Sequence, residues 1–459
     1  MSKMKSYYRL ISMICATVLI SIWQIIPAHA QLLRDTEIEE VLYDFSEPIL
    51  EAAGLKPKSV DLFIVNDPSL NAFVTRGQNI FFHTGLILES QDPNQLKGVI
   101  AHEAGHIAGG HLVRRDEGSR SATAAFLIAA GIGLAAILAG EGEAGSLILG
   151  GSQQFGALEA LAYSRVNEAA ADQYAAQYMA RTGQSAQGLI DFFDKFRYQE
   201  VFSNARRFPY FRGHPLSSER IGALREIVAE SEHPVENDTD EDKKKLRMVQ
   251  AKLYGFLEAP QRVFTTYPES DYSDEAHYAR SIAHFRAANL TQAIKEIDAL
   301  IEREPENPYF YELKGQILFE SGQGFDAIEP LQTALELKPD APLLKVLYGQ
   351  ALIESPETED VEHAVEMLKE ALLLESSNAS AWYFLGQAYG RLNLEGLAKY
   401  ATAEQAFAVG NLQRAQSFAR RAQQEISRDL PQYRRASDIV VISQANLARK
   451  GRDRYRPKP

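Results

Sequence analysis

Two histidines and a glutamate form the most distinctive chemical pattern in this sequence. His102 and His106 are four positions apart, and Glu103 follows the first histidine directly. On a helix, this spacing puts both imidazoles on one face, one turn apart, where they can bind the same Zn²⁺. Glu103 is then placed to take a proton from a metal-bound water. The alternative is an ordinary amphipathic helix with surface histidines.

The residues around this motif predict the helix that it needs. Asp92 is a good N-cap, Pro93 suits the first helical position, and Gln95 lies where a capping box is completed. Apolar residues then recur with helical spacing as far as Ala108. A correctly capped helix favours a metal site over a chance match.

A second predicted helix, over residues 162–175, carries two carboxylates. Glu168 and Asp172 are four apart and share a face, and the alanines between them let another helix approach closely. Two histidines leave a peptidase zinc one protein ligand short, and Glu168 is the candidate for the third. Asp172 is expected to accept a hydrogen bond from a ligating imidazole and fix its tautomer. The alternative is a pair of solvated carboxylates.

A further candidate, His214, lies on a predicted loop. The proline that follows it holds His214 extended. Two roles are open: donating a hydrogen bond to the oxyanion of a tetrahedral intermediate, or binding zinc as a removable fourth ligand. A surface histidine without function is the alternative.

Strand-like runs precede the histidine motif. Segments 60–65, 71–75 and 80–83 predict a small sheet, which follows a helix expected over residues 31–53. An edge strand of this sheet can hold an extended peptide by strand addition, through main-chain hydrogen bonds that ignore sequence. A purely structural hairpin is the alternative.

The start of the chain predicts a secretory signal peptide over residues 1–30. Three basic residues precede the apolar run 10–26, and an Ala-x-Ala pattern ends at Ala30. An uncleaved membrane anchor is the alternative. Cleavage removes the only cysteine, Cys15, so the metal site cannot use thiolates, and it takes the formal charge from −13 to −16. A chain this acidic is a poor binder of phosphates, so we expect no nucleic-acid partner.

Residues 121–139 are almost all apolar. The run is just long enough to span a bilayer, which would make the protein an integral-membrane protease. It is, however, rich in weakly hydrophobic alanine and glycine. We therefore prefer a helical hairpin that packs over the active-site cleft, or a peripheral membrane contact through residues 121–150.

A repeat follows an acidic linker that we assign to residues 233–248. Pro305 and Pro339 are 34 residues apart, the period of tetratricopeptide helix pairs. This period predicts a helical solenoid over residues 249–450, whose concave groove binds segments of other proteins. Its last part alternatively forms a capping helix pair, and residues 451–459 are a basic tail.

Taken in order, these motifs resemble the zinc peptidase family of HtpX and the CAAX-type proteases. The resemblance rests on the motifs at 102–106 and 167–172, on His214 with Arg220, and on the stretches 71–73 and 84–86. It covers essentially the whole mature chain. The signal peptide and the repeats are similar to those of the family's periplasmic members that carry helical repeats.

The resemblance implies a fold, a site and an activity. The fold would be mainly α: an α+β, zincin-like metalloprotease domain with a small sheet over residues 31–232, then a tetratricopeptide solenoid. The site would hold one Zn²⁺ through His102, His106 and Glu168, with catalytic roles for Glu103 and His214, support from Asp172 and Arg220, and substrate contacts from Asn71, Ala72 and Phe73. The activity would be that of a zinc metalloendopeptidase of gluzincin type.

The resemblance also implies a place and partners. The protein would act in the periplasm, or in association with the outer membrane, in the assembly and quality control of outer-membrane proteins. Its expected partners are unfolded or misassembled outer-membrane proteins and, through the repeat groove, the β-barrel assembly machinery. The alternative is a chaperone or assembly adaptor with a latent protease site. The intact Glu103 argues against a vestigial site, because binding alone needs no general base.

Overall fold

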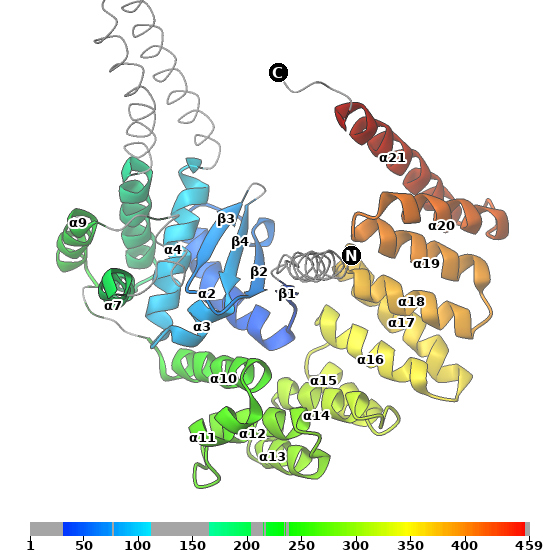
Figure 1. The fold of residues 1–459 in the computed structure, drawn as a ribbon, viewed down its shortest axis with the longest axis horizontal. Helices are drawn as coiled ribbons and strands as arrows, with labels where there is room; N and C mark the ends of the chain where they lie inside the picture. Colours follow the sequence, from blue (N-terminus) through cyan, green and yellow to red (C-terminus); the bar gives the residue numbers. More distant parts are fainter. Residues whose placement is uncertain are drawn as a thin grey trace, which may run out of the picture.

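The structure is a computed structural model that describes residues 31–75, 78–111, 165–202, 214, 217–233, 235 and 238–454. The predicted signal peptide, the apolar stretch 121–150 and most of the basic tail lie outside these residues. The predicted fold class is confirmed: the chain is mainly helical, with a small sheet near its start and a long series of helix pairs behind it (Figure 1).

The sheet has four strands in the order β1-β2-β4-β3. β2 (Asp61–Asn66) and β4 (Asn79–His83) pair in parallel, and β1 (Gln31–Leu33) and β3 (Ala72–Thr75) form the antiparallel edges. The three predicted strands are present. The prediction of a helix from residue 31 is wrong for its first residues, which form β1. The helix α2 (Thr36–Ala52) starts only after Asp35, whose side chain caps it by accepting from the backbone N–H of Ile38.

The helix α4 (Pro93–Ala108), which carries the histidine motif, lies at the centre of the N-terminal part. The Asp92 carboxylate accepts the backbone N–H of Gln95 at 2.9 Å, whereas the Gln95 side chain accepts from Gln91 rather than from Asp92. The predicted capping box is therefore only half formed.

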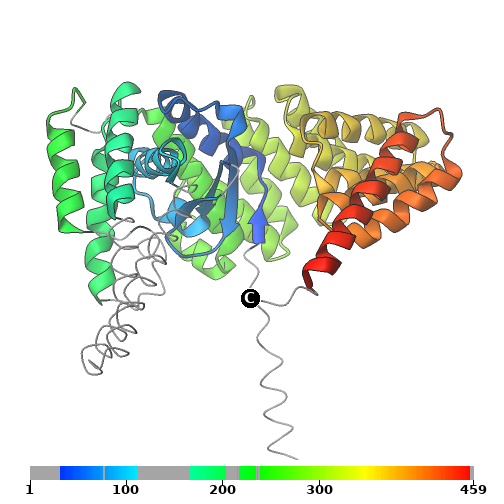
Figure 2. The same cartoon turned by 90° about the horizontal axis from the view of Figure 1, so that it is seen from above.

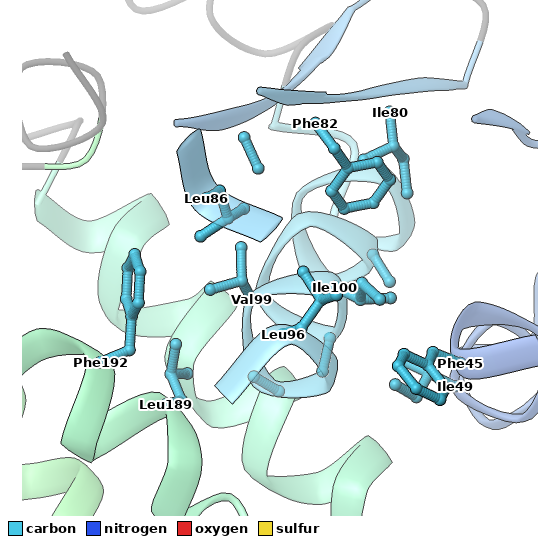
Figure 3. Packing of buried hydrophobic residues seen from close by; sticks show 14 of the residues in the cluster. Phe45, Ile49, Ile80, Phe82, Leu86, Leu96, Val99, Ile100, Leu189 and Phe192 are labelled. Carbon is cyan, nitrogen blue, oxygen red and sulfur yellow. The ribbon is translucent and has the colours of Figure 1, made fainter. Parts of the chain in front are cut away.

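Apolar side chains of α4 are fully buried between the sheet and its neighbouring helices. Figure 3 shows them between β4, α2, α3 (Thr84–Glu89) and α7 (Gln187–Phe202), through the residues Phe45, Ile49, Ile80, Phe82, Leu86, Leu96, Val99, Ile100, Leu189 and Phe192. Burial of each such side chain is worth about 1.5–3 kcal/mol. This packing fixes the orientation of α4 and of the histidines on its other face.

Two glycines let other helices approach the backbone of α4 closely. A Cβ added at Gly98 would lie 2.8 Å from the Cβ of Leu189 on α7. One added at Gly105 would lie 3.1 Å from the carbonyl oxygen of Ala171. Ala171 belongs to the helix over residues 165–181, so this contact brings the second helix against the histidine motif as the alanine run predicted.

The helix α10 (Asp240–Leu257) joins the N-terminal part to the solenoid. Thr239 caps it, and three acidic residues in its first turn favour helix formation at a positive helix end. The second half of the segment that we expected to be a linker is therefore helical. Leu246 and Val249 of α10 belong to the core of the N-terminal part, while Met248 belongs to that of the solenoid.

The solenoid continues as short helices that pack in sequence order (Figures 1 and 2). These are α11 (Pro260–Thr266), α12 (Asp274–Arg286), α13 (Leu290–Arg303), α14 (Pro308–Glu320), α15 (Ile328–Leu337), α16 (Pro342–Glu354), α17 (Thr358–Leu374), α18 (Ala379–Arg391), α19 (Glu395–Ala408), α20 (Leu412–Glu425) and α21 (Pro431–Arg454). Gly315 and Gly349 lie where a Cβ would strike Leu331 and Leu368 of the next helix, which explains why small residues recur. Within the described residues, no helix has both the length and the hydropathy that crossing a bilayer requires.

A buried polar network fastens the first turn of α2 to the solenoid. The ammonium of Lys252 on α10 contacts the carboxylates of Asp35 and Glu37, at 2.8 and 3.2 Å. Glu37 also accepts the hydroxyl of Tyr278 on α12 at 2.7 Å. Glu312 on α14 accepts the hydroxyl of Thr36 at 2.6 Å. The N-terminal part is thereby held against three solenoid helices at once.

Candidate metal centre

Four buried side chains from three parts of the chain converge beside α4. They are His102 and His106 of α4, Glu168 of the helix over residues 165–181, and His214. One ligand atom from each lies within 4.8 Å of all the others. The structure thus brings together the three residues predicted to bind zinc and the one predicted as a removable ligand.

The separations between these ligand atoms fit a tetrahedral metal site. The Nε2 atoms of His102 and His106 are 3.1 Å apart. His214 Nδ1 lies 3.3 Å from His102 Nε2 and 3.0 Å from a Glu168 oxygen. The Glu168 oxygens lie 3.3 and 3.4 Å from the two α4 nitrogens. Ligands at about 2.0–2.1 Å from a tetrahedral Zn²⁺ are roughly 3.3–3.4 Å apart.

The chemistry of this set also fits zinc. Three imidazole nitrogens and one carboxylate oxygen are ligands that Zn²⁺ accepts, and the four-coordinate geometry is the one that it prefers. Imidazole nitrogens that face one another this closely repel through their lone pairs unless a cation or a proton lies between them. Because His102, His106 and Glu168 come from two helices packed through Gly105, their positions are fixed by the fold.

Asp172 and Arg220 contact the converging side chains and orient them. Asp172 Oδ1 lies 3.1 Å from His102 Nδ1, so the other ring nitrogen, Nε2, faces the cluster. Arg220 grips Asp172 with two nitrogens, at 2.7 and 2.8 Å, and lies 3.3 Å from Glu168. Arg220 is in the first turn of α9 (Ser218–Ala229), which the side chain of Ser217 caps. Both residues are therefore positioned as expected.

His111 is a site residue that the sequence analysis did not select. Its Nδ1 lies 2.9 Å from Nδ1 of His106, so it orients that ligand as Asp172 orients His102. Gly110, at φ 64°, turns the chain after α4 and brings His111 back against the helix. A Gly-Gly pair at a helix end followed by a histidine was the available signal.

Glu103 is fully buried, and neither of its carboxylate oxygens has a hydrogen-bond partner among the described residues. Nε2 of His214 is 3.5 Å from one of them. Burial raises the pKa of Glu103 above its ordinary value. A carboxylate with both oxygens available and a raised proton affinity suits a general base that takes a proton from water.

The surroundings shift the pKa values of His102 and Glu168 in opposite directions. Burial disfavours a charged His102, but the carboxylates of Asp172 and Glu168 outweigh it and raise the pKa of His102 to about 9. Burial likewise opposes ionisation of Glu168, yet His102 and His214 hold its pKa well below the ordinary value. The two carboxylates therefore favour a positive charge beside them, which a metal cation can supply in place of the proton on His102.

The predicted substrate-binding residues lie on or beside the edge strand β3. The side chain of Ala72 is fully buried, and Phe73 is half-buried and stacks on Phe81, with ring centroids 4.9 Å apart. The Asn71 amide is 3.5 Å from a ring nitrogen of His83. β3 pairs with β4 on one side and is the last strand of the sheet within the described residues. Any contact by Ala72 must therefore be made through its main chain.

Two family models match separate parts of the chain. Residues 33–228 match the model of peptidase family M48, and residues 278–342 match a tetratricopeptide repeat. The chain carries a peptidase M48 domain followed by tetratricopeptide repeats. All four converging side chains lie within the first match, so this possible metal-binding group belongs to the part of the chain that matches a metallopeptidase family.

Individual proteins match this chain at low sequence identity. The beta-barrel assembly-enhancing protease of Escherichia coli is 25% identical over 300 residues, which cover 63% of this chain and 59% of that protein. The metalloprotease LoiP of Escherichia coli is 30% identical over 178 residues, or 38% of this chain and 64% of LoiP. Among solved structures, the tetratricopeptide protein YrrB is 16% identical over 37% of this chain and 88% of its own, with a TM-score of 0.32.

Proposed function

We propose that this protein is a zinc-dependent endopeptidase. The observation that carries the proposal is the convergence of four ligand atoms at tetrahedral separations beside Glu103, a buried carboxylate without a hydrogen-bond partner among the described residues. His102, His106 and Glu168 would hold the zinc ion, which would supply acidification of a water molecule and polarisation of a substrate carbonyl. Glu103 would take the proton from that water and later deliver it to the leaving amine.

His214 is assigned two roles that depend on its position. At rest, its Nδ1 is the fourth ligand atom, and a site with four protein ligands has no open position for water. His214 itself lies in a bend and in no helix or strand of the described residues, so its departure need not unwind a helix. In the open site, the same side chain can donate a hydrogen bond to the oxyanion.

The two roles of His214 give opposite results on substitution. A latch predicts that His214→Ala raises basal cleavage of an unfolded protein. An oxyanion donor predicts a loss of kcat of about 10²–10³-fold. Zinc-edge spectroscopy separates the cases, since only the latch predicts that a protein nitrogen is replaced by water in the variant.

We propose the edge strand β3 as the place where substrate binds. Strand addition on the side of β3 that pairs with no strand of the described residues would place an extended peptide along β3, next to α4. This mode selects unfolded chains rather than particular sequences, because the main chain makes the contacts. Unfolded or misassembled outer-membrane proteins, rich in strands, are substrates of this kind, and the name of the Escherichia coli relative refers to β-barrel assembly.

The proposed setting is the periplasm, with the solenoid as the docking platform for the β-barrel assembly machinery. The signal-like start of the chain and its repeat domain support this proposal. The chain spans about 59% of the length of the assembly-enhancing proteases that it matches. Cross-linking to purified assembly-machinery proteins, with and without helices α16–α21, tests the platform. Equal cross-linking by both forms would contradict it.

Cleavage of an unfolded β-barrel protein by wild type and Glu103→Gln tests the activity. We expect the variant to retain zinc and to lose about 10²–10⁴-fold in rate, since Glu103 is not a ligand. If the variant cleaves as fast as wild type, Glu103 is not the base. If neither protein cleaves but both delay aggregation, the assembly-adaptor alternative gains.

A further inference from the structure

The last two helices carry a charge opposite to that of the rest of the chain. Residues 412–459 contain twelve arginines and lysines against four aspartates and glutamates, a net formal charge of +8. The remaining residues carry −21, which gives the total of −13. We call α20 and α21 the basic end. It lies at the opposite end of the molecule from α9 (Figures 1 and 2).

The outward face of α21 combines cations with exposed apolar side chains. Ala436, Ile439 and Ser443 are buried against the solenoid and define the inner face. Arg434 and Val441 are seven residues apart on the opposite face, as are Ile442 and Arg449. Val441 is 66% exposed and Ile442 39% exposed. This is an unusual place for aliphatic side chains, because the outer face of a terminal repeat is normally polar.

The face of α20 shows the same combination. Arg414, Phe418 and Arg421 follow helical spacing, and both guanidinium groups lie over the phenyl ring, 5.6 and 5.3 Å from its centroid. Phe418 is only half-buried. The ring braces the two arginines in an outward position and leaves their hydrogen-bond donors available.

The arginines of the basic end differ in whether they pair with a carboxylate of the described residues. Arg435 is neutralised by Glu404, with two hydrogen bonds of 2.7 and 3.0 Å, and it packs over Phe407. Six others are exposed and pair with no carboxylate among the described residues: Arg414, Arg420, Arg421, Arg428, Arg434 and Arg449. Unpaired cations on this scale do not stabilise the solenoid, since like charges repel.

We propose that the basic end docks on an anionic phospholipid surface. Guanidinium groups match lipid phosphates in charge and in hydrogen-bond geometry. Short aliphatic side chains between them can enter the boundary between headgroups and acyl chains, which is the mode of a basic amphipathic helix at a membrane. The acidic remainder of the chain is repelled by the same surface, so the molecule would stand with the basic end towards the lipid and the peptidase site away from it.

A lipid surface fits this face better than an acidic peptide does. Peptides are bound in grooves or along sheet edges, where main-chain or side-chain pockets enclose them. The outer face of a single helix is convex, and a planar surface meets it along its length. The exposed Val441 and Ile442 would also remain in water beside an acidic peptide, whereas a bilayer removes them from it.

Vesicle binding by the processed protein tests the proposal. The test variant is Arg421→Glu, Arg434→Glu, Arg449→Glu. A matched control, Lys58→Glu, Lys295→Glu, Lys369→Glu, changes net charge equally at exposed cations of other elements. We expect wild type and control to co-sediment with vesicles containing phosphatidylglycerol at low salt, and not with phosphatidylcholine alone. The test variant should lose about 100-fold or more in partition coefficient, since each cation near the surface contributes about fivefold.

A second variant, Val441→Ser with Ile442→Ser, separates insertion from electrostatics. Raising the salt concentration should reduce vesicle binding by this variant more than it reduces binding by wild type, because only the apolar contribution resists screening. Equal binding by wild type and the triple arginine variant would overturn the proposal, and so would binding to phosphatidylcholine alone. If the arginine variant instead alters the sedimentation coefficient without lipid, the basic end binds another copy of this acidic chain, which also contradicts it. Circular dichroism confirms that each variant is folded.

Discussion

Glu312 provides a test of how the peptidase domain is held to the repeats. Its carboxylate is buried near Asp35, Glu37, Tyr278 and Tyr309, and the charge of Lys252 partly offsets this burial. Thr36 donates to one Glu312 oxygen, while the other has no hydrogen-bond partner among the described residues. Burial raises the pKa of Glu312 from 4.5 to about 7. The folded protein therefore holds a proton on Glu312 at a pH where the unfolded chain has lost it.

The pH dependence follows from the difference in bound protons. Below about pH 4.5, both states hold the proton, and Glu312 makes no pH-dependent contribution. Between about pH 4.5 and 7, only the folded state holds it, so the free energy of unfolding falls by about 1.4 kcal/mol per pH unit. The loss totals about 3 kcal/mol and levels off above the folded pKa. Glu312→Gln removes this titration, so the variant should gain in relative stability by that amount as pH rises.

The assay is urea unfolding of wild type and Glu312→Gln from about pH 4.5 to 8. Trp382 on α18 is the only tryptophan outside the predicted signal peptide, so in a protein that starts at residue 31 its fluorescence reports on the solenoid. Glu306→Gln, an exposed glutamate next to α14, is the control and should show no such trend. A stability difference between wild type and Glu312→Gln that is the same at every pH would refute the reasoning.

Three further predictions concern single contacts. Asp172→Asn should lower zinc affinity about 10–100-fold, because the His102 tautomer is no longer held, and isothermal titration should show no change for the exposed Asp191→Asn. Lys252→Met should lower the free energy of unfolding by about 3–5 kcal/mol, because it leaves buried carboxylates without this cation. The control Lys245→Met, at a more exposed ion pair, should lower it by about 1 kcal/mol or less. Equal losses in the two variants would contradict the buried network. Gly98→Ala should destabilise the protein by about 1–3 kcal/mol, because the added methyl group collides with Leu189. Gly222→Ala on α9, where the added methyl group meets open space, should leave stability unchanged or raise it. Thermal melts that rank the two variants the other way would refute the packing of α4 on α7.

Features encoded in neighbouring residues were predictable. The pair at 102 and 106, the cap at Asp92 and the alanine run after Glu168 act within one or two helical turns, so helical geometry alone relates them. The 34-residue period likewise reports on one structural unit at a time. These local signals were enough to predict side chains that the structure brings together, because two helices that each expose candidate ligands on one face can share a metal only when they pack.

What the sequence did not reveal depends on partners that are distant along the chain. Gln31–Leu33 forms a strand because residues 64–66 lie beside it, and nothing in the three residues themselves opposes a helix. Lys252 interacts with the carboxylates of residues 35, 37 and 312, and from the sequence alone such charged residues would be predicted to lie on the solvated surface. His111 depends on the backbone turn at Gly110. Each role is set by tertiary contact, which no local pattern reports.

X-ray absorption at the zinc edge, with metal analysis of the same purified protein, tests the central claim most directly. The account predicts one zinc per chain with nitrogen and oxygen ligands only, dominated by imidazole scattering at about 2.0–2.1 Å. It also predicts loss of that zinc in the His102→Ala, His106→Ala variant. Full zinc occupancy in the double variant, or sulfur in the coordination sphere, would contradict it.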